Sequence, residues 1–436
     1  MQNFNNLINK FGINKKREIE RLIFEIAKIE NTNPQNIVSL LNGKNYQSIK
    51  KELLLKRYPN AFKEVPLSAF YLPKYEIDPN LKANISALNF YPKNIYYTQK
   101  SKDSKVFFNA KKLFANAKFT EISSLKDFAK NRPFTLKDFN LRLDNLILTE
   151  EKFDFFKKCP CTQNVVNCGY SIMNLGMGCP YECSYCFLQG YQNIAAIILS
   201  ANIKDFLQKA KIDFLKDVPN GVFKYKRVGS GEFCDSLVFD NLTESSVDII
   251  DFFSKIPDMF FEFKTKSVQI SNLLAKGGRK NIVVSWSVNS LKMQTENEFL
   301  TPSILERLKA ASLCAKAGFN IGFHFDPIIF YSGWRQGYKE TVDMIFDMVE
   351  NDAIKWISLG TLRMPSTLKP IIENRFPQTK ILDGELILGE DFKLRYLPKL
   401  KIEMYQYISK LINSKKSKTQ VYLCMENGNT WTKALS

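Results

Sequence analysis

The sequence predicts an α/β protein built around a partial (β/α)6 barrel, with an N-terminal helical and irregular extension and a short C-terminal helix and strand. Three observations support this prediction. The chain has 436 residues, enough for a barrel with appendages. After Cys168, apolar β-branched runs alternate with segments of helical periodicity. Such alternation builds a parallel sheet through right-handed crossovers, and about six units make an open or closed barrel.

The first expected region is helical and covers residues 1–60. Apolar side chains recur at helical spacing from Ile19 to Ile29, and a second amphipathic run extends from Asn36 to Leu54. We therefore expect a small helical unit at this end of the chain.

The second expected region, residues 61–164, is an irregular α+β segment. Its pattern is broken by lysine-rich turns, and short strands are expected at Asn94–Tyr97 and Val106–Asn109. No function follows from this pattern.

The barrel is expected over residues 165–390, followed by a C-terminal extension over 391–436. In such barrels the chemistry takes place on loops at the C-terminal ends of the strands. The expected strands are Tyr170–Leu175, Ala195–Ser200, Phe223–Val228, Phe260–Lys264, Ile282–Val288, Asn320–Phe325 and Trp356–Gly360. Helices are expected at Ile203–Leu215, Glu244–Phe253, Pro302–Lys316, Tyr338–Val349 and Lys399–Asn413, with a last strand at Gln420–Cys424.

Composition excludes some classes of protein. A hydrophobic fraction of 45% and an aromatic fraction of 13% exclude a disordered chain. No apolar stretch approaches the ~18 residues of a membrane span, and Met1–Lys16 lacks a secretion signal, so we expect a cytoplasmic protein without a membrane partner. The 62 Lys+Arg against 44 Asp+Glu give a net charge of +18, which fits a polyanion such as DNA. Solvated lysines alone would produce the same surplus.

Three cysteines follow the first expected barrel strand as Cys-x3-Cys-x2-Cys: Cys179, Cys183 and Cys186. Three thiolates on one loop can hold an iron–sulfur cube, which normally takes four cysteines, and the remaining iron could bind a non-protein ligand. Structural zinc is the alternative. Zinc sites usually pair two short Cys/His knuckles, however, and no second knuckle of that form follows.

This triplet, with an aromatic residue before its last cysteine, resembles the radical S-adenosylmethionine superfamily. The longer string NLGMGCPYECSYCFLQGYQN resembles the spore photoproduct lyase family within it. The resemblance spans roughly Phe156 to Asn427 and leaves the first 150 residues uncovered. Further matching strings are KCPCT, GSGEFCDSL, KTKS, SWSVN, GFHFDPII, GWRQGY and LCMEN.

The resemblance implies cofactors and an activity. Cys179, Cys183 and Cys186 would ligate a [4Fe-4S] cluster whose fourth iron binds S-adenosyl-L-methionine. An electron from a reductant such as flavodoxin or ferredoxin would then split the cofactor, and the resulting 5′-deoxyadenosyl radical would abstract hydrogen from the substrate. The implied enzyme is a radical lyase that reverses a thymine-dimer-type lesion in DNA, extruded from the duplex to reach the barrel.

The resemblance also implies cofactor-binding residues. Gly231 and Glu232, in the string GSGE, match a segment that contacts the cofactor, although an ordinary strand-to-helix turn would use the same residues. Lys266 matches a lysine placed near the cofactor carboxylate, and Ser285 matches a cofactor-contacting serine. A lysine at the barrel rim and a strand serine are the alternatives.

Two catalytic residues follow from the resemblance. Cys234 lies in the loop where the family places the cysteine that returns a hydrogen atom to the thymine radical, but an ungapped alignment puts Glu232 there. A buried structural cysteine is the alternative. Tyr185 matches one of two radical-relaying tyrosines, whereas the second position is Phe187, which has no phenolic hydrogen.

Other functions remain open. Phe187 and the uncertain register of Cys234 allow a radical enzyme that acts on a modified nucleotide or a peptide. A non-catalytic iron–sulfur protein that binds nucleic acid is a third reading. Three upstream cysteines, Cys159, Cys161 and Cys168, could form a second metal site or be buried thiols. The single histidine, His324, is expected in the barrel core or cofactor pocket.

Overall fold

The computed structural model describes residues 9–435 except 40, 42, 87–89, 131, 153–154, 162–163, 215–220 and 416–417. The chain forms two compact units. Unit 1 consists of Met1–Lys82 and Leu362–Lys401, and unit 2 consists of Ala83–Thr361 and Ile402–Ser436. In the described part of the chain, no helix is long and apolar enough to cross a membrane.

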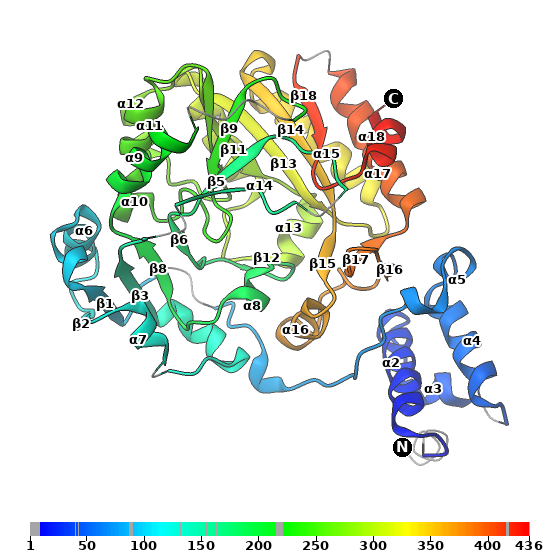
Figure 1. Cartoon of the computed structure of the whole chain (residues 1–436). Helices are drawn as coiled ribbons and strands as arrows, with labels where there is room; N and C mark the ends of the chain where they lie inside the picture. Colours follow the sequence, from blue (N-terminus) through cyan, green and yellow to red (C-terminus); the bar gives the residue numbers. More distant parts are fainter. Residues whose placement is uncertain are drawn as a thin grey trace. The chain divides into compact units, whose positions relative to one another are not determined.

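Unit 2 contains a curled, eight-stranded sheet (Figure 1). Its neighbouring strands are parallel, except that β4 runs antiparallel to β5. The strands β5 to β14 form a partial six-stranded barrel, so the predicted fold class is confirmed. The order is β18 (Gln420–Leu423), β14 (Ile354–Thr361), β13 (Asn320–Ile328), β11 (Ile282–Ser287), β10 (Met259–Thr265), β9 (Lys226–Ser230), β5 (Tyr170–Met173) and β4 (Phe156–Lys158).

Helices connect the barrel strands and cover their outer face. Strand β11 is buried at every position, because one of its faces meets these helices and the other lines the barrel interior. The helices of unit 2 that follow β8 are α9 (Ile203–Phe214), α10 (Asp240–Thr243), α11 (Ser245–Phe253), α12 (Ser271–Lys276), α13 (Leu291–Asn297), α14 (Ile304–Lys316), α15 (Trp334–Met348) and α18 (Gly428–Leu435). A further helix, α17 (Pro398–Ser414), begins in the last residues of unit 1.

A second sheet in unit 2 corrects one prediction. It has the order β2 (Lys118–Ile122), β1 (Asn94–Thr98), β3 (Asn145–Thr149), β8 (Ile197–Ser200) and β6 (Gly176–Met177), all parallel except β6. The expected barrel strand Ala195–Ser200 therefore belongs to this sheet, where Ile197 pairs with Leu146 of β3. A buried apolar run predicts a strand but not the sheet that it joins.

The prediction of a strand at Val106–Asn109 is wrong, because this segment lies in helix α6 (Lys105–Leu113). The Ser104 side chain caps the helix by accepting from the backbone N–H of Phe107. The buried face carries Val106, Phe107 and Ala110, a spacing that a helix satisfies and a strand does not. With helix α7 (Leu125–Lys130), α6 packs beside a parallel sheet, so residues 61–164 are not irregular throughout.

Unit 1 combines a small group of helices with a three-stranded antiparallel sheet. The run predicted from Asn36 to Leu54 is divided into two helices, because Asn45 caps a new helix by accepting from the Ser48 N–H. The expected region boundaries stay predictions, but Leu362–Lys401 packs with the N-terminal helices. The elements are α2 (Ile13–Ile29), α3 (Pro34–Ser39), α4 (Tyr46–Arg57), α5 (Ala61–Glu64), β15 (Arg363–Pro365), α16 (Leu368–Arg375), β16 (Leu386–Leu388) and β17 (Lys393–Tyr396).

A buried carboxylate joins the helices of unit 1. Glu25 on α2 accepts from Arg57 on α4 at 2.8 Å and from Lys369 on α16 at 2.7 Å. Burial opposes ionisation, but Lys369, Arg57 and Arg21 outweigh it and lower the pKa of Glu25 to about 2. The glutamate therefore stays charged in the folded unit.

Candidate functional site

The three predicted cluster cysteines lie on one loop that follows β6 in unit 2. Gly178 begins this loop with a φ of +99°, and a Cβ there would stand 2.9 Å from the Ile197 side chain, so glycine is required. Cys183 lies in β7 (Glu182–Cys183), which pairs with β12 (Glu298–Phe299). Cys179 and Cys183 each interact electrostatically with Cys186, which places the three thiols near one another.

Two side chains hold the backbone of this loop. Arg142 donates to the carbonyls of Cys179 at 3.2 Å and Tyr181 at 3.1 Å, and it pairs with Glu182 at 2.7 Å. Gln189 donates to three further loop carbonyls, those of Cys183, Ser184 and Cys186. The loop carbonyls are thereby satisfied by protein donors, and the thiols remain available as ligands.

The donor set fits an iron–sulfur cluster better than zinc. Burial raises the pKa of the Cys183 thiol to about 12, although the Lys266 cation nearby lowers it in part. All three thiols are free of disulfide bonds. Among the described residues, no three Cys, His, Asp or Glu side chains are placed to hold a single metal ion. Ligands of a cube bind separate irons and need not converge on one point, whereas the ligands of zinc must.

The loop after β9 lies beside the cysteines. The Gly178 N–H donates to the Phe233 carbonyl at 2.8 Å, which joins the two loops. Gly231 has a φ of +100°, and a Cβ there would stand 2.7 Å from the Ser236 hydroxyl. Asp235 accepts from the Thr265 hydroxyl at 2.5 Å and from the Lys266 N–H at 2.7 Å, so it anchors this loop to the end of β10. Sequence reasoning missed Asp235, although it lies in the string GSGEFCDSL.

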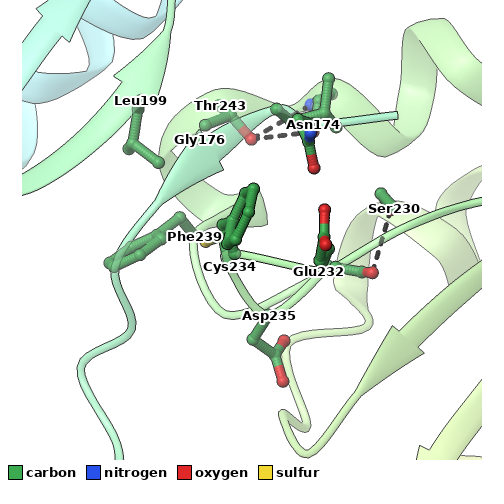
Figure 2. A pocket seen from close by; sticks show the side chains of 14 residues that line it. Asn174, Gly176, Leu199, Ser230, Glu232, Cys234, Asp235, Phe239 and Thr243 are labelled. Carbon is green, nitrogen blue, oxygen red and sulfur yellow. Dashed lines mark hydrogen bonds between the residues drawn. The ribbon is translucent and has the colours of Figure 1, made fainter. Parts of the chain in front are cut away.

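The Glu232 carboxylate points across a pocket toward Asn174 (Figure 2). It forms an ion pair with Lys157 at 2.7 Å. Lys157 comes from β4, a strand that the sequence analysis did not predict. The pocket therefore contains a carboxylate that already has a cationic partner.

Cys234 lines the same pocket and lies on its Phe239 side (Figure 2). It packs against the apolar core of the second sheet. Burial, with Asp235 beside it, raises the pKa of the Cys234 thiol. An electrostatic interaction with Cys179 places it near the predicted cluster ligands. The residue is therefore a protonated thiol next to the site.

Tyr185, in the cysteine loop, and Lys266, just after β10, lie close together. The Lys266 ammonium is 5.7 Å from the centroid of the Tyr185 ring. The Tyr185 hydroxyl donates to Glu298, and Arg307 pairs with the same carboxylate at 2.6 Å. Glu298 and Arg307 were missed, because they are distant from the cysteines in the sequence and β12 brings them close.

Ser285 lies in the barrel interior, where its hydroxyl donates to Glu262. The same carboxylate accepts from Trp356 at 2.7 Å and lies 2.8 Å from His324 Nε2. His324 is thus a buried core residue with a partner. The predicted contact between Ser285 and the cofactor stays a prediction. Ser287 faces the same side of β11, two residues nearer the end of the strand where the site lies.

The upstream cysteines gather with one further cysteine. The Cys159 thiol makes a hydrogen bond with Cys161, and both Cys168 and Cys424 are close enough to interact electrostatically with it. Cys424, which follows β18, was not part of the predicted group. Among the described residues, no three of these thiols are placed to hold a single metal ion.

Comparison with known proteins gives one consistent result. The family model described as spore photoproduct lyase matches residues 163–422. Curated spore photoproduct lyases are 25% identical over 211 residues in Clostridium acetobutylicum and 26% identical over 212 residues in Bacillus subtilis. Each match covers 48% of this chain and 61% of the relative, so it spans about three fifths of the relatives' length.

Solved structures are similar in fold. A spore photoproduct lyase complexed with dinucleoside spore photoproduct has a TM-score of 0.63 and 22% identity, covering 77% of this chain and 99% of that one. A double mutant of spore photoproduct lyase with bound AdoMet and the dinucleoside has the same values. The fold of this chain, with its partial barrel, therefore matches a solved fold.

Proposed function

The chain belongs to the spore photoproduct lyase family, and from this premise we propose that it is a radical S-adenosylmethionine lyase that repairs a thymine-dimer-type photoproduct in DNA. The observation that carries the proposal is the loop of three free cysteines, one buried and two half-buried, at the C-terminal end of a partial barrel. The net charge of +18 supports DNA as the partner. Flavodoxin or ferredoxin is proposed as the electron donor.

Cys179, Cys183 and Cys186 would hold the [4Fe-4S] cluster. With the cluster and S-adenosylmethionine bound, an electron would split the sulfonium to give the 5′-deoxyadenosyl radical. Lys266, directed at the loop from the end of β10, would bind the cofactor carboxylate. Glu232 would give up its ion pair with Lys157 and bind the cofactor ammonium instead. We assign Ser285 a structural role in the barrel interior, because its hydroxyl already donates a hydrogen bond to Glu262.

Cys234 is the proposed hydrogen donor. Its raised pKa keeps the S–H bond intact. Transfer of that hydrogen atom to the thymine radical would complete the product and leave a thiyl radical on Cys234. Tyr185 would restore the thiol by giving up its phenolic hydrogen atom, with its hydroxyl oriented by Glu298. The tyrosyl radical left on Tyr185 would return to tyrosine by taking one electron from the same reductant and one proton. Phe187 takes no part in this transfer, because it has no hydroxyl.

The test is anaerobic reconstitution with iron and sulfide, followed by reduction in the presence of S-adenosylmethionine and a dinucleotide photoproduct. We expect both 5′-deoxyadenosine and repaired thymines. Electron paramagnetic resonance with and without S-adenosylmethionine reports whether the cofactor binds the cluster. Absence of 5′-deoxyadenosine under strong reductant would support a non-catalytic iron–sulfur protein instead.

A second candidate is a radical enzyme acting on a modified nucleotide or a peptide. Phe187 favours it, because the position lacks the phenol of a two-tyrosine relay. Formation of 5′-deoxyadenosine without thymine repair would select this candidate.

A further inference from the structure

We propose that Phe187, Tyr191 and Phe233 form a stacking surface for unpaired nucleobases at the mouth of the barrel. These three rings are called the aromatic rim below. The proposal rests on the proposed function, and it adds the contact that would hold an extruded base or its neighbour beside the site.

The rings of the aromatic rim lie against one another. The centroids of Phe187 and Tyr191 are 5.6 Å apart, with the rings at 84°. Phe233 is 6.3 Å from each of the other two centroids. Phe187 is 37% exposed and Tyr191 is 60% exposed, whereas aromatic side chains mostly bury their large apolar area. An exposed group of this kind marks an interaction site more often than a single exposed ring does.

The rim is built from the two loops of the candidate site. Phe187 directly follows the ligand Cys186, and Tyr191 ends helix α8 (Leu188–Tyr191) four residues later. Phe233 lies between Glu232 and Cys234 in the loop after β9. Its carbonyl accepts the hydrogen bond from the cysteine loop, so the backbone that carries the rings is fixed. A base stacked here would lie next to the residues that carry out the proposed chemistry.

Charge next to the rim favours a nucleotide. The Lys157 ammonium lies 4.3 Å from the Phe233 centroid. It would meet the phosphate of a stacked nucleotide once Glu232 has turned to the cofactor ammonium. A lesion outside the duplex has lost its stacking partners, and aromatic side chains replace them at any base. The alternative use of an exposed aromatic surface is to bind an electron-donor protein. The test below distinguishes this use from base stacking.

The test measures how the reconstituted protein binds a fluorescent single-stranded oligonucleotide that contains the photoproduct, by anisotropy at several salt concentrations. Tyr191→Ala should weaken binding by roughly 5- to 150-fold, the usual loss for one stacked base. Tyr191→Phe keeps the ring and should bind like the wild type. The slope of log affinity against log salt should stay unchanged in both variants, because no cation is lost.

A matched control is Phe108→Ala on α6, since Phe108 is 59% exposed and lies outside the rim. It should leave affinity unchanged. Iron content of each variant verifies that the cysteine loop is intact.

Three results would overturn the inference. If Tyr191→Ala binds the oligonucleotide as tightly as the wild-type protein, and the wild-type protein repairs the photoproduct, the aromatic rim does not bind bases and the proposed function still holds. If Tyr191→Ala keeps its DNA affinity but flavodoxin reduces its cluster more slowly, the aromatic rim is a docking surface for the electron-donor protein. A wild-type protein that neither binds nor repairs the oligonucleotide would remove the inference together with the proposed function.

Discussion

At the scale of single residues, Cys234 links the pocket to the proposed chemistry. Its thiol is protonated, lies near Cys179 and is held by a loop that Asp235 anchors. The sequence predicted Cys234 with an uncertain register, because Glu232 competed for the same role. The structure separates the two side chains: Glu232 pairs with Lys157, and Cys234 packs toward Phe239.

Cys234→Ala should uncouple the two halves of the reaction. We expect 5′-deoxyadenosine at the wild-type level, because the cluster ligands are untouched. Conversion of the photoproduct to thymines should fall by about tenfold or more, which corresponds to at least ~1.4 kcal/mol of activation free energy. Chromatography of both products measures this. Cys314→Ala, at a buried free cysteine that does not line the pocket, is the control and should repair normally. Equal repair by both variants would exclude Cys234 as the donor.

Ser285 is a second residue, and its contributions to stability and to cofactor binding can be measured separately. Its hydroxyl donates to the buried Glu262 carboxylate, and a hydrogen bond to a charged group contributes about 1.5–3 kcal/mol. Ser285→Ala should lower the free energy of unfolding by that amount and leave S-adenosylmethionine affinity unchanged. Urea unfolding and equilibrium dialysis measure the two quantities. A large loss of cofactor affinity with unchanged stability would restore the predicted cofactor contact.

At the scale of elements, the cysteine loop depends on residues that only the fold brings to it. The spacing of the cysteines predicted the loop and its ligands. It could not predict Arg142 or Glu298, because these side chains come from distant segments, and local patterns carry no information about such pairings. The barrel strands were predicted because most are short runs rich in apolar β-branched or aromatic residues. The strand predicted at Val106–Asn109 was wrong because a short apolar run fits either period.

Arg142→Lys should reduce the amount of cluster that the loop retains. The two carbonyl contacts and the Glu182 ion pair use three separate nitrogens of the guanidinium, and the single nitrogen of a lysine cannot occupy all three positions. We expect less iron and sulfide per chain after reconstitution and faster loss to a chelator. Arg132→Lys is the control, because Arg132 donates to the Tyr96 hydroxyl and not to this loop. Equal iron content in both variants would contradict a role for Arg142 in holding the loop.

The stability of the unit 1 helices depends on pH through the ionisation of Glu25. The pKa of Glu25 falls from an ordinary value of 4.5 to about 2 on folding, so its stabilisation, about 3 kcal/mol, is present above pH ~4.5. It is lost as the pH falls toward 2. Glu25→Gln should therefore be less stable than the wild type at pH 6, and the difference should shrink in acid. Hydrogen exchange of α2 at several pH values measures it, and a pH-independent difference would contradict this account.

At the scale of the whole molecule, the positive charge is unevenly distributed. Unit 1 carries 22 Lys+Arg against 13 Asp+Glu, half of the net surplus in little more than a quarter of the chain. Several of its lysines are paired with glutamates, for example Lys50 with Glu18. Lys15 on α2 and Lys51 on α4 are exposed, and neither forms an ion pair among the described residues. Composition predicted the total charge but could not predict this distribution, which depends on which segments pack together.

If DNA is the partner, each lysine that neutralises a phosphate releases counterions, and the slope of log affinity against log salt is about −0.9 per phosphate. Replacing Lys15 and Lys51 by glutamine should therefore make the slope shallower by up to ~1.8 and weaken binding equally for damaged and undamaged duplexes. Lys309→Gln on α14, also exposed, is the control. Titrations of a duplex by anisotropy measure all three slopes. A double variant with the wild-type slope would exclude Lys15 and Lys51 as phosphate contacts.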